Sequence, residues 1–190
     1  TVEVDDLQME AGAQLLVRNG AVKTGKVTMS NGAVLDVVDG SLSLDPLGFG
    51  EFHTIDGTFT FFNSLGSLNI NGDTSFSGSS LCLASNIHIA SGVTLSVLGS
   101  LILDGCLVDG SGSYNVFVNV GATFRMIRCE VSEMALSLVG NDVLLRDNHF
   151  RSGVVTVFGS VNGAEIYHNV FEAGASALNV FPGASIGTTS

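Results

Sequence analysis

The stretch Leu145-Arg146-Asp147-Asn148-His149-Phe150 returns about twenty residues later as Ile166-Tyr167-His168-Asn169-Val170-Phe171. In both copies an apolar residue stands three positions before an asparagine and another stands two positions after it. Shorter versions of this pattern, in which alternating apolar residues surround a small glycine-containing turn, occur at residues 9–17, 29–37, 89–97 and 118–126. A repeat of roughly 20 to 30 residues predicts a solenoid, in which each repeat forms one coil stacked on the last.

Within each coil the apolar residues alternate with polar ones, as residues 136–150 and 155–171 illustrate. This period of two is typical of short strands with one inward face. Equivalent residues of stacked coils lie about 4.8 Å apart. We therefore expect Phe150 to lie over Phe171 and Leu145 over Ile166, in an all-β solenoid of about seven or eight coils that forms a single domain over residues 1–190.

Two stretches depart from the repeat and are expected to be loop insertions, at residues 45–57 and 104–113. The second stretch has an alternative interpretation as a regular coil, because Cys106 and Val108 align with Cys129 and Val131. Loops that leave a rigid scaffold often carry binding sites, so both stretches are candidates for one.

One corner of the coil follows a composition rule. Gly20, Gly40, Asn148 and Asn169 stand three residues after the second inward apolar residue of their coils. Glycine and asparagine tolerate the left-handed backbone region, so we expect that conformation at these positions. Stacked asparagines are also expected to hydrogen-bond corner backbone groups along the coil axis. Cys129 breaks the rule, since cysteine is unusual in that region.

The composition limits the partners and cofactors. Eighteen acidic and seven basic residues give a formal charge of −11, which disfavours nucleic acid and anionic membranes, and no apolar run is long enough for membrane insertion. The three cysteines, Cys82, Cys106 and Cys129, are expected to be buried thiols. We expect no cofactor; calcium is the alternative, at the aspartate pairs Asp36 and Asp39 or Asp104 and Asp109, although ordinary turn aspartates are favoured.

The stretches 145–150 and 166–171 resemble the coil pattern of the right-handed parallel β-helix superfamily, and the resemblance spans nearly the whole chain. That superfamily includes pectate lyases, phage tailspikes, autotransporter passenger domains and bacterial surface proteins. The resemblance implies a right-handed parallel β-helix, and it is better evidence for fold than for function.

The densest polar patch is expected on the outside of the last coils. Its members supply acids, bases and cations within about two coil spacings: Arg125, Arg128, Glu130, Arg146, Asp147, His149, Glu165, Tyr167 and His168. Stacking predicts that Arg128 lies over Asp147, as in a surface ladder of ion pairs. No two carboxylates fall on adjacent coils of one column, as glycoside hydrolysis would require. The ladder interpretation is therefore favoured over a catalytic site.

These observations favour a non-enzymatic structural or adhesive module, located outside the cell or at its surface. Its expected partners are other copies or neighbouring solenoid segments. The repeat that starts at residue 184 is unfinished, so we expect further coils in a longer polypeptide or a partner that docks at an end. The alternative is a carbohydrate-active β-helix, either a polysaccharide lyase or hydrolase fragment or a tailspike-like glycan binder, with a polysaccharide as its partner.

Overall fold

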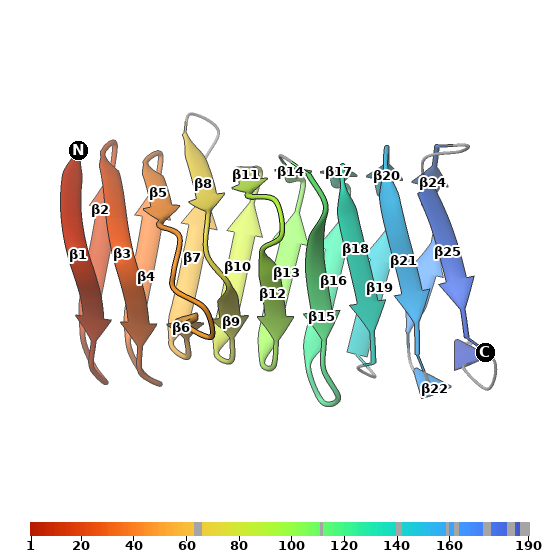
Figure 1. Cartoon of the computed structure of the whole chain (residues 1–190), viewed down its shortest axis with the longest axis horizontal. Helices are drawn as coiled ribbons and strands as arrows, with labels where there is room; N and C mark the ends of the chain where they lie inside the picture. The colour runs from red at the N-terminus through yellow and green to blue at the C-terminus, as the bar shows by residue number, and fades with distance from the viewer. Residues whose placement is uncertain are drawn as a thin grey trace.

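The computed structural model describes residues 1–62, 66–110, 112–139, 142–158, 160–161, 164–172, 176–181 and 185–186. Every regular element in these residues is a β-strand, and the strands pair in parallel. They wind into a β-solenoid of about eight turns, with the N-terminus at one end of the long axis and residues 170–180 near the other (Figure 1). The predicted all-β solenoid is confirmed.

Three strand-lined faces surround the interior. Face A is an eight-stranded sheet made of β2 (Gln14–Arg18), β4 (Val34–Val38), β7 (Thr58–Phe62), β10 (Ser79–Leu83), β13 (Ser100–Asp104), β16 (Thr123–Ile127), β19 (Asp142–Arg146) and β23 (Glu165–Tyr167). Face B contains β5 (Ser41–Leu44), β8 (Ser67–Ile70), β11 (Asn86–Ile89), β14 (Leu107–Gly110), β17 (Glu130–Val131), β20 (His149–Phe150) and β24 (Val170–Phe171). Face C contains β6 (His53–Ile55), β9 (Thr74–Phe76), β12 (Thr94–Val97), β15 (Tyr114–Val118), β18 (Met134–Leu138), β21 (Gly153–Val157) and β25 (Ser176–Val180).

Faces B and C are joined at the N-terminal end by one long strand, β3 (Ala21–Met29). Its first half pairs with β5 and its last two residues pair with β6, while β1 (Val2–Met9) runs along its length. The short strand β26 (Ser185–Ile186) pairs with β22 (Ser160–Val161). The unfinished repeat expected at the C-terminus falls mainly on residues 182–184 and 187–190, which lie outside the described residues.

The interior is a continuous set of apolar columns, because inward positions of successive turns are in register. One column on face A contains Val17, Val37, Phe61, Cys82, Leu103, Met126, Leu145 and Ile166. At the next face the rings of Phe150 and Phe171 stack with centroids 4.7 Å apart and planes 4° apart. Both predicted stacking pairs are confirmed. Burial of such side chains stabilises each turn only through its neighbours.

The corner between faces A and B repeats one backbone conformation. Positive φ values occur at Asn19, Asp39, Ala84, Gly105, Arg128, Asp147 and His168. Four of these, Asn19, Asp39, Asp147 and His168, stand one residue before the expected positions. The prediction for Gly20, Gly40, Asn148 and Asn169 was therefore wrong by one residue. The left-handed residue sits on the outside of the corner, where even Arg128 is accommodated. The residue that follows it is turned inward, so Cys129 needs no unusual conformation.

The inward corner residues use their side chains to bond the backbone of neighbouring turns. The Asn148 side-chain amide donates to Met126 O (2.8 Å) and to Asn169 Oδ1 (2.9 Å), and its Oδ1 accepts from Cys129 N (2.9 Å). Asn169 repeats the pattern with Leu145 O at 2.8 Å. The predicted asparagine ladder is thus confirmed. Ser85, Cys106 and Cys129 occupy the same corner in earlier turns and donate to backbone carbonyls in the same way.

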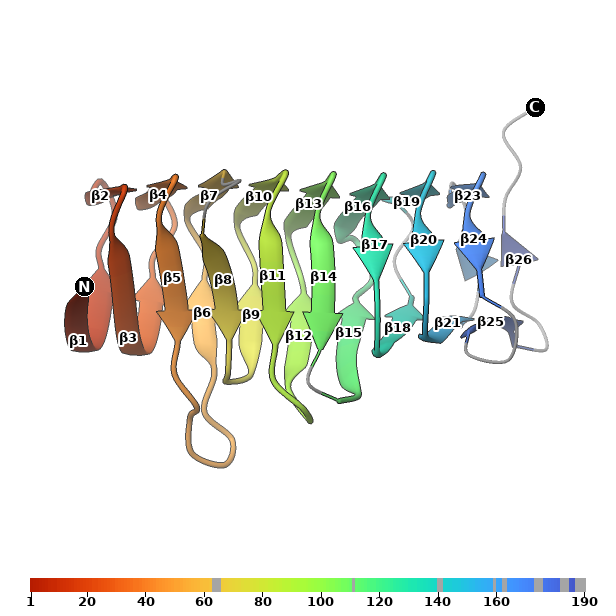
Figure 2. The same ribbon diagram turned by 90° about the horizontal axis from the view of Figure 1, so that it is seen from above.

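Only one of the two expected insertions is a loop. Residues 45–52 leave the solenoid as a loop between β5 and β6 (Figure 2), whereas residues 53–55, the start of the next turn, return to a strand. The expectation of a loop at 104–113 was wrong, because β14 pairs with β11 and β17 in the regular register. Cys106 and Val108 keep the inward period, which identifies residues 104–110 as part of an ordinary turn of the solenoid; residue 111 lies outside the described residues. All three cysteines are free and buried, as predicted.

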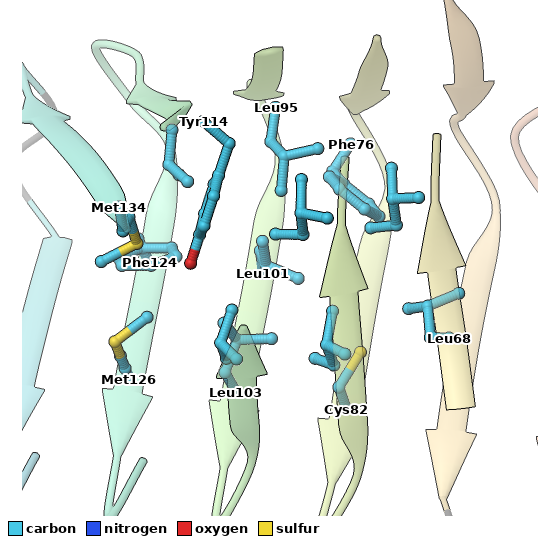
Figure 3. Close-up of a pocket in the computed structure, with 15 residues that line it drawn as sticks. Leu68, Phe76, Cys82, Leu95, Leu101, Leu103, Tyr114, Phe124, Met126 and Met134 are labelled. Carbon is cyan, nitrogen blue, oxygen red and sulfur yellow. The ribbon is translucent and has the colours of Figure 1, made fainter. Parts of the chain in front are cut away.

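The middle of the core encloses a small apolar cavity of about 20 Å³, which has room for about one water molecule. Figure 3 shows Tyr114 extending into this space, with its hydroxyl oxygen beside Phe124. Tyr114 is fully buried, and its hydroxyl has no hydrogen-bond partner among the described residues. Burial raises the pKa of Tyr114 above its ordinary value. Gly110 makes room for the ring, because a Cβ there would lie 2.5 Å from Tyr114 Cδ1.

We predict that Asn148→Ala lowers the free energy of unfolding by about 2–4 kcal/mol, because it leaves the buried Met126 carbonyl and Cys129 amide without their partner. Chemical denaturation followed by circular dichroism measures the change. The matched control is Asn69→Ala on the outside of face B, where the amide contacts only Ser67 Oγ, at 3.2 Å, among the described residues. That control is expected to stay within about 0.5 kcal/mol of wild type. Equal effects of the two substitutions would contradict the ladder's role.

We predict that Tyr114→Phe leaves the free energy of unfolding unchanged or raises it by up to about 1 kcal/mol, since it removes a buried hydroxyl that lacks a protein partner. Thermal and denaturant unfolding give the comparison. Tyr167→Phe, on the exposed side of face A, serves as the control and is expected to have no effect. A loss of more than about 1 kcal/mol for Tyr114→Phe would mean that the hydroxyl is bonded in solution.

Candidate functional site

The structure stacks the predicted polar patch in adjacent columns. Arg125, Arg146, Glu165 and Tyr167 point outward from β16, β19 and β23 of face A. Arg128, Asp147 and His168 are the left-handed residues of three successive corners. Glu130 and His149 are paired on the outside of face B. The expected columns therefore exist, and the patch spans one face, its corner and the edge of the next face.

Each arginine and histidine of this patch lies near a carboxylate, but the one predicted pair, Arg128 with Asp147, is not formed. Arg128 makes a two-nitrogen contact with Asp104 of the preceding turn, at 2.6 Å and 3.0 Å to Oδ1, instead of with Asp147. This hydrogen bonding raises the pKa of Arg128. The Asp147 carboxylate instead lies 3.3 Å from Arg146 Nε and 3.4 Å from His168 Nδ1. The reason is directional: Asp104 projects outward from the end of β13, within reach of the guanidinium.

The remaining pairs extend the same ladder. Arg125 lies 3.6 Å from Asp142, His149 lies 2.8 Å from Glu172, and Glu130 lies 2.9 Å from Arg151. These side chains are largely exposed, so each pair is worth about 0–1 kcal/mol. These pairs join acidic and basic side chains of neighbouring turns along the solenoid axis. The patch is therefore a series of surface ion pairs. In one of the two aspartate pairs named as calcium candidates, Asp104 forms an ion pair with Arg128 and Asp109 accepts a hydrogen bond from the Ser132 hydroxyl.

A second candidate site lies under the insertion loop, and the residue pattern alone did not assign its members. The loop and the turns beside it enclose a groove of about 430 Å³, lined by Leu47, Gly48, Phe49, Gly50, Glu51, Phe52, Asn71, Gly72, Asp73, Ser91, Gly92 and Val93. Figure 2 shows the loop standing away from the stacked turns. The sequence signal was the break in alternation at residues 48–52, where two phenylalanines lack an inward column.

His53 fastens this loop to the solenoid. The ring is fully buried at the start of β6, where Nδ1 accepts from Val27 N at 3.2 Å and Nε2 lies 2.9 Å from Asp45 O. Both bonds form only in the neutral tautomer that carries its proton on Nε2. Desolvation lowers the pKa of His53, and the positive charge of Lys26 lowers it further. The hydrogen bond to the Asp45 backbone and the charges of Asp45 and Asp73 raise the pKa, but they do not outweigh the desolvation. Gly72 packs against the ring, since a Cβ there would lie 2.8 Å from Nε2.

The tip of the loop is shaped by a tight turn. Glu51 N donates to Gly48 O at 3.0 Å, and the Glu51 carboxylate accepts from Gly48 N at 3.1 Å. Gly50 has a φ of +78°, a conformation that favours glycine. Across the groove, Asp73 accepts from Thr94 N at 2.7 Å. The groove lining includes two exposed phenylalanines, Phe49 and Phe52, and two acidic residues, Glu51 and Asp73, and it contains no basic side chain.

Within the described ranges, no three His, Cys, Asp or Glu side chains gather as a metal site requires. The same residues include no helix long and apolar enough to cross a membrane. No protein-family model, curated protein or solved structure matches this chain.

We predict that the free energy of unfolding falls as the pH drops below about 6.5, because unfolded histidine binds a proton that buried His53 resists. The folded pKa is the lower one, so the stabilisation is fully present above the unfolded pKa and is lost as pH falls through the folded pKa. Denaturant unfolding between pH 5 and pH 8 measures this. His53→Gln should reduce the pH dependence, whereas the exposed control His88→Gln should keep it. An unchanged pH profile in His53→Gln would contradict the assignment.

Proposed function

We propose that this chain is a non-enzymatic structural or adhesive module, located outside the cell or at its surface, that assembles with other copies or with neighbouring solenoid segments. The observation that carries the proposal is an uncharged face on a strongly acidic molecule. This uncharged face consists of the outward residues of β9, β12, β15, β18, β21 and β25 together with the residue that follows each strand. Its members with described side chains are Ser75, Ser77, Thr94, Ser96, Leu98, Asn115, Phe117, Asn119, Ala135, Ser137, Val139, Val154, Thr156, Phe158, Asn179 and Phe181.

The charge distribution determines which surfaces of two copies tolerate each other. With a formal charge of −11, two copies repel each other at long range. Faces A and B carry outward charges such as Asp36, Asp142, Asp109 and Arg151. The uncharged face carries none over six turns. When two copies meet through this face, no like charges are brought into contact. This favours the uncharged face as the contact surface.

The uncharged face also exposes apolar side chains that lose water on association. Leu98, Phe117, Val139, Val154, Phe158 and Phe181 are exposed along it. Two of them, Phe158 and Phe181, already stack with ring centroids 4.7 Å apart. Contiguous apolar residues with a polar rim are typical of interaction sites. Here serine, threonine and asparagine form the rest of the surface and can hydrogen-bond across a contact.

The size of the face limits the strength of the contact. Six strands about 4.8 Å apart, each about five residues of 3.3 Å, give a flat area of roughly 500 Å². Two copies would bury on the order of 1,000 Å² in total, near the lower limit for a specific interface. We therefore expect weak, concentration-dependent association of single chains. Repetition along a longer array of turns would strengthen it.

We predict that the weight-average mass of the purified chain rises with concentration in sedimentation equilibrium and light scattering. Ser137→Asp, at the centre of the uncharged face, is expected to weaken association at least about tenfold. Ser100→Asp introduces the same charge on face A at a similarly half-buried position and is expected to change association little. Equal effects of the two variants would reject this face as the interface. A strictly monomeric particle that cleaves an acidic polysaccharide would overturn the proposed function as a whole.

A further inference from the structure

We propose that the groove beneath the insertion loop binds a positively charged peptide segment, in which an arginine or lysine stands next to an apolar side chain. The groove shares no residue with the uncharged face, so this site is separate from the assembly surface. Its volume of about 430 Å³ falls within the range of clefts that bind ligands.

The loop is preorganised for binding. His53 joins the loop base to β3 through Val27 N and Asp45 O, and the turn at Gly48 and Glu51 closes on itself. A surface already held in its binding geometry loses less conformational entropy when a ligand arrives. Both ends of the loop are held by backbone hydrogen bonds to different turns of the solenoid, from Asp45 N to Thr24 O and from His53 N to Asp73 O.

The loop presents aromatic surface to solvent. Phe49 is fully exposed at the loop tip, and Phe52 is exposed beside the groove. Neither ring joins the apolar columns that bury Phe59, Phe61, Phe76, Phe124 and Phe150. Exposed aromatic rings act as anchors in protein interfaces, where burial removes them from water. An apolar side chain of the partner would pack against these rings.

The charges of the groove select a cation. Glu51 and Asp73 line it, and the lining contains no lysine, arginine or histidine. Asp45 lies at the loop base, where Lys23 approaches it at 3.6 Å on the side of face B. Each lining carboxylate accepts one backbone amide and keeps further lone pairs for a ligand. A guanidinium or ammonium group can contact both a carboxylate and the face of a phenylalanine ring.

The groove places exposed aromatic rings beside carboxylates, and this combination favours a peptide as the partner. An apolar surface and a negative field within one short cleft match neighbouring side chains of one extended segment. Anionic ligands are disfavoured by the lining and by the formal charge of −11. A neutral glycan could stack on the rings, but it carries no positive charge to pair with the carboxylates. The experiment below therefore includes a neutral glycan as a competing ligand.

The test is fluorescence anisotropy with a labelled seven-residue peptide in which two arginines flank a leucine, titrated with the full chain. The matched probes carry glutamates instead of the arginines, or serine instead of the leucine. We expect both replacements to weaken binding at least fivefold, and we expect the affinity of the arginine peptide to fall as salt rises. In the protein, Glu51→Gln and Phe49→Ala are each expected to weaken binding about tenfold, without a change in the circular dichroism spectrum.

The control variant Asp36→Asn removes the same charge from face A, away from the groove, and is expected to change affinity less than twofold. Equal losses in Asp36→Asn and Glu51→Gln would mean that the peptide senses only net charge and would overturn the proposal. Unchanged affinity in Glu51→Gln and Phe49→Ala would overturn it as well. Tighter binding of a neutral glucan oligosaccharide, lost in Phe49→Ala, would reassign the groove to carbohydrate. Self-association, measured separately with Ser137→Asp, distinguishes failure of this site from failure of the assembly proposal.

Discussion

The register between successive turns is the constraint on which the rest of the structure depends. One turn of this chain has almost no interior, so an inward leucine or phenylalanine leaves water only when the turns above and below cover it. Columns such as Phe61, Cys82 and Leu103 exist because parallel pairing places these positions side by side. A shift of one residue would point each column outward, which makes the register strongly specified.

The corner between faces A and B secures that register with polar contacts. Strand hydrogen bonds stop at the end of each strand, and the backbone groups beyond need other partners. An outward left-handed residue turns the next side chain inward, where serine, cysteine or asparagine donates to a carbonyl of a neighbouring turn. The most complete version is found at Asn148 and Asn169, whose amides bond both the backbone and each other. Local turn geometry and axial stacking therefore support the same register.

The surface of the solenoid divides into regions that differ in charge and polarity. The polar patch of the last turns is a chain of ion pairs, in which carboxylates and cations of adjacent turns compensate each other. The uncharged face allows close contact between acidic molecules. The groove beside the insertion loop, which His53 fastens, is lined by two phenylalanines and two carboxylates outside the columns of the core. A solenoid suits this division because outward side chains change without disturbing the interior.

The repeat in the sequence was sufficient to predict the solenoid, the stacking of Phe150 on Phe171, the asparagine ladder and the columns that contain Arg125, Glu165 and Tyr167. These features follow from strand periodicity and turn spacing, which are local and additive along the chain. Sequence did not decide whether residues 104–113 form a loop or a turn, and it placed the left-handed residue one position late. It also paired Arg128 with Asp147, although side-chain direction joins Arg128 to Asp104.

Only the tertiary structure decided the two surfaces proposed to bind. The uncharged face combines two or three residues from each of six turns that are far apart in the chain, so no single segment of sequence displays it. The groove depends on the insertion loop, which His53 fastens through Val27 and Asp45, and residues 46–52 have no strand partner in the neighbouring turns from which their positions follow. Periodicity predicts what every turn shares, because stacking enforces it. What one turn does differently depends on contacts between distant residues, which only the folded chain brings together.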